Sequence, residues 1–407
     1  MNTELYIARK MISQKKAEGQ LTKPILRITM LAIALGIAVM LISIAVLKGF
    51  QGEITKKISG FGAHIQIKPL SQNSSPDGDA FNAKQSFVAD LKNIDGVVNV
   101  QAFATKPAII KADEEIEGVL LKGIDKNYNW NYFQEKLVSG RIPQFNDTSK
   151  SNDILLSAQL AAKLKLKLND NVFLYFIQQP PRMRKLTICG IYKTGLEEFD
   201  TKYAFADIAH IQKLNDWGKD SIAGYEILID DFNNLEKINE QVSETIPYDF
   251  TSQSIKQVFP QLFDWLNLQD MNVVVILVIM TIVCVINMIS GLLIIILERT
   301  QFIGMLKSMG ASNWMVRKIF IYHAVSIVGK GMLWGNVFGI GLCALQYFFH
   351  FIKLDEASYY VSYVPVLLNP LLILGVNVAT LVICTAAMLL PSLLITKITP
   401  IKAIRFS

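Results

Sequence analysis

The chain has 407 residues, of which 51% are hydrophobic and 18% charged, with a net charge of +6 and a mean hydropathy of +0.34. This composition excludes an ordinary soluble globular protein and indicates a membrane protein. The charge is uneven, because residues 49–270 hold 24 basic and 29 acidic residues, a net of −5, which leaves +11 for the rest. We expect a mildly acidic domain inside a basic membrane protein, and the total charge gives no indication of nucleic-acid binding.

Cysteine and histidine are sparse. Cys284, Cys343 and Cys384 lie in apolar runs, so Cys189 has no disulfide partner within the acidic segment. The four histidines are far apart, with no cluster of cysteines or carboxylates around them. The sequence therefore predicts no metal site and no cofactor.

The N-terminal region predicts a surface helix followed by a membrane span. Residues 1–24 form an amphipathic leader with five Lys or Arg residues. Ile28–Leu47 carries no charge over 20 residues, so the first span is expected at 25–48. A cleaved signal peptide is the alternative, since Ser43-Ile44-Ala45 resembles a cleavage site, but the apolar run and the leader are both too long for one.

Residues 49–270 predict a large α+β domain. The first helix is expected to continue to Gly60 or Gly62, and the polar residues 71–80 to form a loop. Expected helices are 82–93, 157–166, 207–215 and 232–245, and expected strands are 64–68, 97–104, 106–112, 116–124, 172–177, 185–193 and 225–230. We expect two lobes that part near residues 123–154.

Three more spans are predicted. A helix resumes at Ser252 or Ser254, with a kink expected at Pro260. The expected segments are a second span at 271–297, a connection at 298–318, a third span at 319–351, a short loop at 352–369, a fourth span at 370–396 and a tail at 397–407. The predicted fold class is an α-helical membrane protein with four transmembrane helices and a large α+β extracytoplasmic domain inserted between helices 1 and 2.

Orientation follows from the basic residues near the spans. Lys and Arg are concentrated in the leader, in 298–318 and in the tail, whereas 352–369 holds a single lysine. By the positive-inside rule both termini and 298–318 are cytoplasmic. The inserted domain is then periplasmic, in a multi-pass protein of the cell inner membrane.

The segment that follows the second span predicts a short amphipathic helix. After Glu298-Arg299, apolar residues recur at helical spacing, and Gly310 is placed to end the helix in a left-handed cap. Such a helix either docks into a groove on another protein or lies on lipid.

No catalytic motif is present. The chain has no G-x-x-x-x-G-K-[ST] run for nucleotide phosphates, no G-x-S-x-G elbow and no H-E-x-x-H helix. We therefore expect a non-catalytic subunit whose energy comes from a partner chain.

The pattern Glu298-Arg299-x-x-x-Ile303-Gly304-x-Leu306-Lys307-x-x-Gly310 resembles the signature of the permease module in the MacB/FtsX superfamily of ABC transporters. The resemblance implies that these seven residues form the cytoplasmic coupling helix, which sits on a separate ABC ATPase dimer. It also implies a second permease copy or homologue, because two coupling helices serve the ATPase pair.

Two stretches narrow the resemblance to lipoprotein-releasing (LolC/LolE-type) permeases: Ile58-Ser-Gly-Phe-Gly-Ala-His64, and Gly190-Ile-Tyr-Lys-Thr-Gly195-Leu-Glu-Glu-Phe-Asp200. In that family a loop just before the second stretch hooks a periplasmic lipoprotein carrier. The equivalent residues here are Gln179, Pro180, Pro181, Arg182 and Met183, and the alternative is an ordinary hairpin loop.

The implied function is extraction of lipoproteins from the inner membrane toward a periplasmic carrier. The alternatives are an FtsX-like regulator of a cell-wall hydrolase and an efflux permease with a separate ATPase. Extraction requires an apolar cavity for acyl chains beside the membrane lipid, with Met40, Ile282 and Asn287 as candidate lining residues.

Lys330 interrupts the third span, about 18 Å along a helix from Lys318, which places it near the middle of the membrane unless the helix first runs beneath the bilayer. Its role is left open between snorkelling, pairing and substrate contact. The glycines around it, from Gly329 to Gly341, are expected to serve helix packing.

Overall fold

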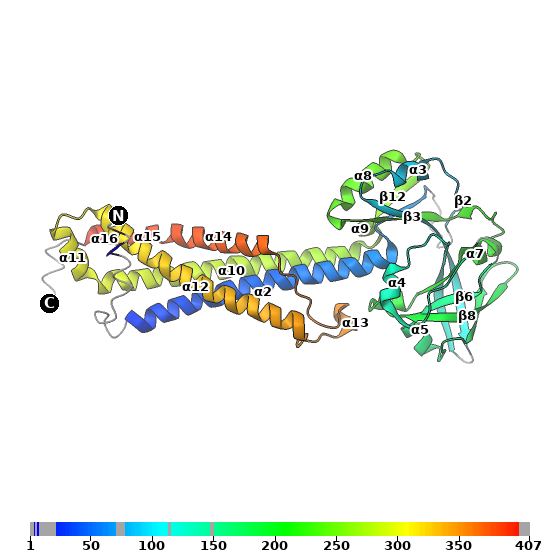
Figure 1. Ribbon diagram of the computed structural model, residues 1–407, viewed down its shortest axis with the longest axis horizontal. Coiled ribbons are helices and arrows are strands. Elements are labelled where there is room, and N and C mark those ends of the chain that lie inside the picture. The colour runs from blue at the N-terminus through cyan, green and yellow to red at the C-terminus, as the bar shows by residue number, and fades with distance from the viewer. Residues whose placement is uncertain are drawn as a thin grey trace. The chain divides into compact units, whose positions relative to one another are not determined.

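The computed structural model describes residues 4, 6–7, 22–70, 78–112, 115–146 and 150–398. The chain divides into two compact units, whose elements Figure 1 shows. We call them the helical unit (Met1–Gln51, Leu266–Lys353 and Tyr363–Ser407) and the sheet unit (Gly52–Trp265 and Leu354–Ser362). Nearly all of the predicted leader and tail, and most of the loop predicted at 71–80, lie outside the described residues.

Apolar helices of membrane length build the helical unit. Four helical segments of the described chain are long and apolar enough to cross a membrane: α2 (Thr22–Gly62), α10 (Pro260–Glu298), α12 (Asn313–Phe349) and the stretch that begins with α14 (Pro370–Ala387). That last stretch continues as α15 (Leu389–Ser392) and α16 (Leu394–Lys397), because Pro391 cannot continue the helical hydrogen bonding. The short α11 (Thr300–Ser308) joins α10 to α12. The predicted class of a four-span protein with a large inserted α+β domain is confirmed.

Helix α2 packs against α12 through glycines spaced four residues apart. A Cβ atom added at Gly331, Gly335 or Gly339 would lie 2.9, 2.7 or 3.1 Å from atoms of α2. Because these positions lack side chains, the two backbones approach closely, as in small-xxx-small contacts between membrane helices. The predicted packing role is thus confirmed for these three glycines, whereas Gly329 and Gly341 have no neighbour within 4 Å of an added Cβ.

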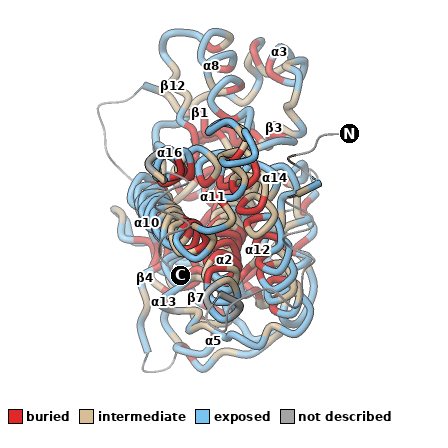
Figure 2. The backbone as a smooth tube through the Cα atoms, turned by 90° about the vertical axis from the view of Figure 1, so that its left-hand side faces the viewer, coloured by how far each residue is buried: buried red, intermediate tan, exposed pale blue. Residues whose placement is uncertain are grey.

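Helix α10 is the most exposed of the four. Only 11% of its most apolar window is buried, against 50% for α2. Figure 2 shows the contrast, with α10 largely pale blue and α2 coloured more in red and tan. Its contact with α2 is narrow and includes Gly36, where an added Cβ would lie 2.5 Å from the sulfur of Cys284. A broad apolar face of α10 therefore has no partner within the described chain.

The sheet unit is a mixed α/β domain. Its strands are β1 (Ile65–Pro69), β2 (Phe81–Asn82), β3 (Val97–Ala112), β4 (Glu115–Ile124), β5 (Leu137–Gly140), β6 (Asp153–Ser157), β7 (Asn171–Phe176), β8 (Arg182–Tyr192), β9 (Tyr203–Asp207), β10 (Ser221–Ile222), β11 (Gly224–Ile229) and β12 (Phe250–Ser254). Within the described residues, ten of them form one sheet in the order β12-β1-β11-β3-β4-β9-β6-β8-β5, with β7 against β3 and β8, while β10 pairs with β2 separately. Strands β5 to β9 make up one half of this path, so the chain from 137 to 207 builds one side of the sheet.

Short helices cover the sheet and connect its strands. They are α3 (Phe87–Lys92), α4 (Asn131–Lys136), α5 (Ala158–Lys163), α6 (Glu197–Asp200), α7 (Ile208–Leu214), η1 (Phe232–Asn234), α8 (Leu235–Thr245), α9 (Ile255–Val258) and α13 (Glu356–Tyr359). The four helices predicted from the sequence in this region are all present. Elements α4, α6, α13, β2, β5, β6, β9, β10 and β12 were not predicted, because each is at most six residues long and lacks a clear periodicity.

One strand differs from the prediction of two. Strand β3 passes through Pro107 without a break. On one edge of β3, pairing with β11 ends at Phe103 and pairing with β7 starts at Ile109. Pro107 lies between these two regions and therefore pairs with β4 alone. A proline that lacks a ladder donor is tolerated at such a locally unpaired edge.

The chain re-enters the helical unit through a capped turn. Ser254 is the N-cap residue of α9, as predicted, and its N–H donates to the side-chain oxygen of Gln257 over 3.0 Å. Phe259 is not helical, with φ −123° and ψ 61°, and α10 begins at Pro260. Pro260 therefore starts a helix, where its missing N–H costs nothing, and does not kink a continuous one.

Buried aromatic rings hold the end of α2 in the sheet unit. The ring of Phe61 stacks on Phe199 with centroids 4.3 Å apart and meets Tyr203 edge-on at 4.9 Å. Beside these rings, the Lys122 ammonium donates to Glu226 over 2.6 Å, with side chains 5% and 1% exposed. The pair links β4 to β11 across β3, and removal of one member would leave a buried charge unpaired.

Candidate functional site

Helix α11 ends as its sequence predicts. Gly310 has a φ of +91°, the N–H of Ala311 donates to Leu306 and the N–H of Gly310 donates to Lys307. These two bonds form a Schellman motif, which satisfies the carbonyls at the end of the helix. Ser312 then caps α12 by accepting from the N–H of Met315. The α11–α12 connection is therefore a rigid turn.

The apolar side of α11 packs against its own chain. Ile303 is fully buried and Gly304 is buried, while Leu306 is half-buried. The Lys307 ammonium donates to the carbonyls of Ile395 and Ile398 over 2.6 and 2.7 Å. Burial lowers the pKa of Lys307, and its hydrogen bonds tie α11 to the end of α16. These four candidate coupling residues therefore hold α11 against its own chain and do not form its exposed surface.

The outward side of α11 carries a different set of residues. Gln301, Met305 and Met309 are exposed at spacings of four, and Met305 and Met309 are 56% and 78% exposed. Trp314, at the start of α12, is 52% exposed, and the cations of Arg317 and Lys318 lie 5.3 and 5.7 Å from the centre of its ring. We call Gln301, Met305, Met309 and Trp314 the α11 face. Methionines exposed outside the spans suit an adaptable docking surface.

The charge pair before α11 lies at a one-residue break. Glu298 is the last residue of α10, and Arg299, half-buried, is the N-cap of α11. The Thr300 hydroxyl donates back to the carbonyl of Leu297 over 2.6 Å. The N–H of Arg299 donates to Ile295 and the N–H of Ile303 donates to Arg299, so helical hydrogen bonding nearly continues across the break.

The candidate cavity residues differ in exposure. Ile282 is 52% exposed on the open face of α10, Asn287 is half-buried, and Met40 is 2% exposed in the core of the helical unit. Met40 packs beside Thr281, whose hydroxyl lies 3.8 Å from its sulfur. The open apolar face therefore belongs to α10, with Ile282, Val275 and Ile286 upon it.

The candidate hook lies at the turn of the β7–β8 hairpin. Arg182 makes a bidentate ion pair with Asp216 at 2.9 and 2.8 Å and also donates to the carbonyl of Leu214. This clamp fixes the base of the turn to the end of α7, while Gln179, Pro180 and Pro181 are exposed.

Apolar residues surround that turn. Ile177 is 87% exposed, Met183 is 47% exposed and Tyr175 is 40% exposed, and Tyr175 pairs directly with Met183 across the hairpin. Sequence reasoning missed Tyr175 and Ile177. The alternation of side chains along β7 could have identified them, because it places residues 173, 175 and 177 on one face of the strand.

The stretch from Gly190 to Asp200 proves to be a folding motif. The buried Asp200 carboxylate accepts from the N–H and hydroxyl of Thr194 and from the N–H of Gly195. Burial raises the pKa of Asp200, and these donors oppose that rise. Gly195 has a φ of +76°, a left-handed conformation that disfavours other residues.

A segment more than 150 residues further along the chain contacts this motif. Glu356 of α13 lies 2.5 Å from the Lys193 ammonium and 3.8 Å from that of Lys57. Lys57, 7% exposed, also donates to the carbonyl of Tyr360 over 2.7 Å. The segment Leu354–Ser362 between α12 and α14 is therefore part of the sheet unit.

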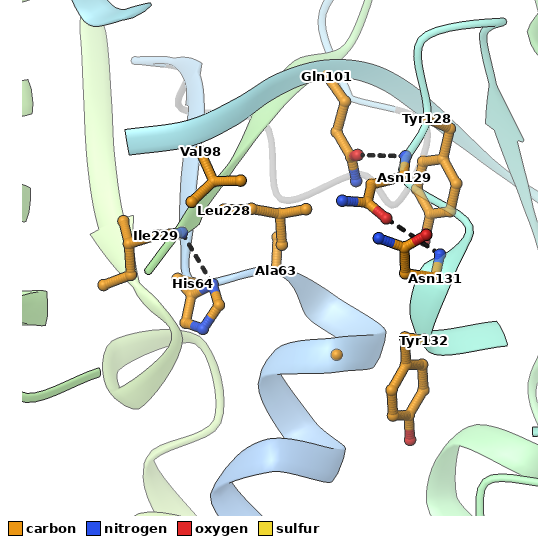
Figure 3. A pocket seen from close by; sticks show the side chains of 11 residues that line it. Ala63, His64, Val98, Gln101, Tyr128, Asn129, Asn131, Tyr132, Leu228 and Ile229 are labelled. Atoms are coloured by element: carbon orange, nitrogen blue, oxygen red, sulfur yellow. Dashed lines mark hydrogen bonds between the residues drawn. The ribbon is translucent and has the colours of Figure 1, made fainter. Parts of the chain in front are cut away.

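One cavity in the sheet unit offers no chemically active group. Figure 3 shows this cavity of about 210 Å³, where His64 accepts from the N–H of Ile229 and Gln101 from that of Asn129. Burial lowers the pKa of His64 from 6.5 to about 4, so the ring is neutral at pH 7. His64 and Gln101 are thus already used by the local backbone, whereas the buried hydroxyl of Tyr132 has no hydrogen-bond partner. The described residues also contain no cluster of His, Cys, Asp or Glu that could hold a metal ion.

Four apolar helices of membrane length, a large mixed sheet unit after the first and an amphipathic helix between the second and third define a multi-spanning permease with an inserted domain. The chain belongs to the family of the MacB-like periplasmic core domain, which matches residues 27–245. Residues 274–400 match the FtsX-like permease C-terminal description.

Relatives of known name align over nearly the whole chain. It is 23% identical to the lipoprotein-releasing system transmembrane protein LolE of Haemophilus influenzae, over 99% of both chains. It is 22% identical to LolC of Xylella fastidiosa, over 93% of both chains. The periplasmic region of MacB from Actinobacillus actinomycetemcomitans superposes with a TM-score of 0.35 and 14% identity, covering 50% of this chain and 95% of that one.

We predict that the Glu356 contacts hold Leu354–Ser362 on the sheet unit. Glu356→Lys should weaken this attachment by about 1–3 kcal/mol, less than for a fully buried pair because Glu356 is 29% exposed. Hydrogen exchange of the backbone amides of this segment should then rise at least about fivefold.

Exchange of the charges supplies the control. Adding Lys193→Glu to Glu356→Lys should restore part of the protection, whereas Glu135→Lys, which breaks an exposed pair with Lys56, should leave it unchanged. Equal exchange rates in Glu356→Lys and wild type would show that the ion pairs do not hold the segment.

Proposed function

We propose that the chain is the permease subunit of an ABC transporter that uses a separate ATPase to extract lipoproteins from the inner membrane. The full-length similarity to LolE and LolC supports this substrate class. The structural observation that carries it is the open apolar face of α10, because a lipid-anchored substrate needs apolar walls for its acyl chains. Each buried methylene contributes about 0.8 kcal/mol, so acyl chains cannot leave the bilayer without such a surface.

The α11 face is the docking surface for the ATPase in this proposal. ATP-driven closure of the ATPase pair presses on α11, and the stiff joint at Arg299 passes the displacement to α10. Helices α10 and α2 each continue from the helical unit into the sheet unit, so both carry the displacement onward. The second permease, a copy or a homologue, provides the other coupling helix.

The exposed hairpin turn at 177–183 is the contact for a periplasmic lipoprotein carrier. Because the base of the turn is clamped, its apolar residues form a stiff surface that loses little conformational entropy on binding. The chain itself hydrolyses nothing in this mechanism, and both termini face the cytoplasm.

A labelling experiment tests the orientation. We expect Gly118→Cys, at an exposed position with no neighbour within 4 Å, to react with an impermeant maleimide in intact spheroplasts. Ser308→Cys, exposed on α11, should react only after the membrane is opened. The four native cysteines are buried and give a low background. The reverse pattern would invert the proposed topology.

A second experiment tests the coupling surface. Met305→Asp with Met309→Asp should lower stimulation of the partner ATPase at least tenfold, since each buried methionine contributes about 1.5–3 kcal/mol to docking. Both side chains are exposed, so the fold should survive. Met183→Asp is the matched control and should weaken carrier binding without changing ATPase stimulation. Full stimulation in the double variant would exclude α11 as the docking surface.

A third experiment separates extraction from regulation. A photoreactive residue at Ile282 should crosslink to an acylated protein, and the crosslink should disappear when ATP and a soluble carrier are added. The same residue at Leu374, 59% exposed on α14, is the control for general contact with the membrane. Crosslinks confined to the sheet unit, to a hydrolase and not to a lipoprotein, would favour the FtsX-like regulator. Crosslinks at Ile282 to small amphiphiles alone would favour efflux.

A further inference from the structure

Three basic side chains from two helices surround a cavity in the helical unit. The cavity, of about 170 Å³, is lined by Arg27 of α2 and by His323 and Lys330 of α12. Ser326 adds a hydroxyl, and Leu26 and Met30 add apolar walls. Since a single water needs about 10–15 Å³ of such space, the cavity can hold a phosphate group and several waters.

The polar groups of this cavity lack partners in the described chain. His323 is 6% exposed, and its Nδ1 atom is buried without a hydrogen-bond partner. Neither Arg27 nor Lys330 pairs with an acidic residue that the structure describes, and Arg299 adds a further positive charge acting on His323. An unsatisfied buried nitrogen beside unpaired cations indicates that an anion with hydrogen-bonding oxygens belongs there.

The depth of Lys330 places the cavity at a membrane surface. An added Cβ on the next residue, Gly331, would lie 3.1 Å from the carbonyl of Met30, so Lys330 is level with the first turn of α2 beyond Arg27. From Gly331 to Phe349, α12 is uncharged over 19 residues, about 28 Å of helix. That length matches the hydrocarbon core of a bilayer, about 30 Å thick. Lys330 therefore lies at the edge of that core and not at its middle.

We infer that this cavity binds the phosphate of an anionic phospholipid headgroup. Arg27 offers the planar fork that phosphate oxygens accept, Lys330 a point charge, and His323 a ring N–H. Exposed apolar residues adjoin the cavity on α2, with Ile28 and Leu31 64% and 61% exposed, so acyl chains can continue from it along the helix. Because free phosphate has no acyl chains, this apolar surface favours a lipid headgroup as the ligand.

The bound lipid then joins α2 to α12 beside the start of α11. Basic pockets between membrane helices favour anionic headgroups, and net positive charge selects them over zwitterionic ones. The inference stands apart from the transported substrate, because it concerns a resident lipid of the bilayer.

The test measures lipid retention and thermal unfolding of the full-length protein in detergent. Added phosphatidylglycerol should be retained in native mass spectra and should raise the unfolding temperature in a saturable manner. Phosphatidylcholine should have a smaller effect, and inorganic phosphate little. Arg27→Gln with Lys330→Gln should weaken phosphatidylglycerol binding at least tenfold.

Two further variants keep the result interpretable. Lys48→Gln with Lys318→Gln removes one charge from each of the same helices outside the cavity and should bind like wild type. His323→Phe keeps a ring of similar size without the nitrogens and should bind more weakly. Wild-type binding in the Arg27/Lys330 variant would overturn the inference. Equal effects of phosphatidylcholine and phosphatidylglycerol would also overturn it, as would protection by inorganic phosphate alone.

Discussion

Helix α2 is the element on which both units depend, and different interactions bury its two ends. In the helical unit, backbone contacts with Gly331, Gly335 and Gly339 bring α12 against it. In the sheet unit, Ile58 is fully buried and Phe61 stacks on Phe199. The helix is continuous over 41 residues. Each end of the helix is therefore held by close-packed contacts within its own unit.

Charge is used in this protein to fix segments in place. Lys122 and Glu226 join two strands in the core, Arg182 and Asp216 clamp the hairpin turn, and Glu356 fixes a distant segment to Lys57 and Lys193. The surfaces proposed for partners are, by contrast, largely apolar. They are the α11 face, the hairpin residues and the open side of α10. This division suits a machine that moves a lipid-anchored cargo, because apolar contacts can form and release without the desolvation cost of ion pairs.

The exception is the cavity around Arg27, His323 and Lys330, where cations remain without partners in the described chain. Its position at the edge of the apolar part of α12 gives it access to headgroups, while its apolar neighbours give it access to acyl chains. In the binding proposed for this cavity, Lys330 contacts the headgroup of a resident lipid and not the transported substrate.

Local chemistry in the sequence was enough to predict much of the architecture. Uncharged runs predicted three of the spans, and an apolar run interrupted only by Lys330 predicted the other, since charges are costly in hydrocarbon. Gly310 and Ser254 predicted helix ends, because their caps involve neighbours in the chain. The candidate coupling segment was also found from its local pattern. The residues that this helix exposes were not predicted. An amphipathic pattern defines two faces of a helix, but it does not say which face packs against the rest of the chain. Here Ile303 and Gly304 turn inward and Met305 and Met309 outward.

Contacts between distant residues were decided only by the tertiary structure. Glu356 meets Lys57 across about 300 positions, and Lys122 meets Glu226 across 104. Pro107 stays within one long strand because of where two other strands stop. Lys330 reaches the membrane surface because α12 starts well before its apolar part, and Arg27 meets it only because glycines bring α2 alongside. No local pattern encodes these pairings, since each depends on how separate elements pack.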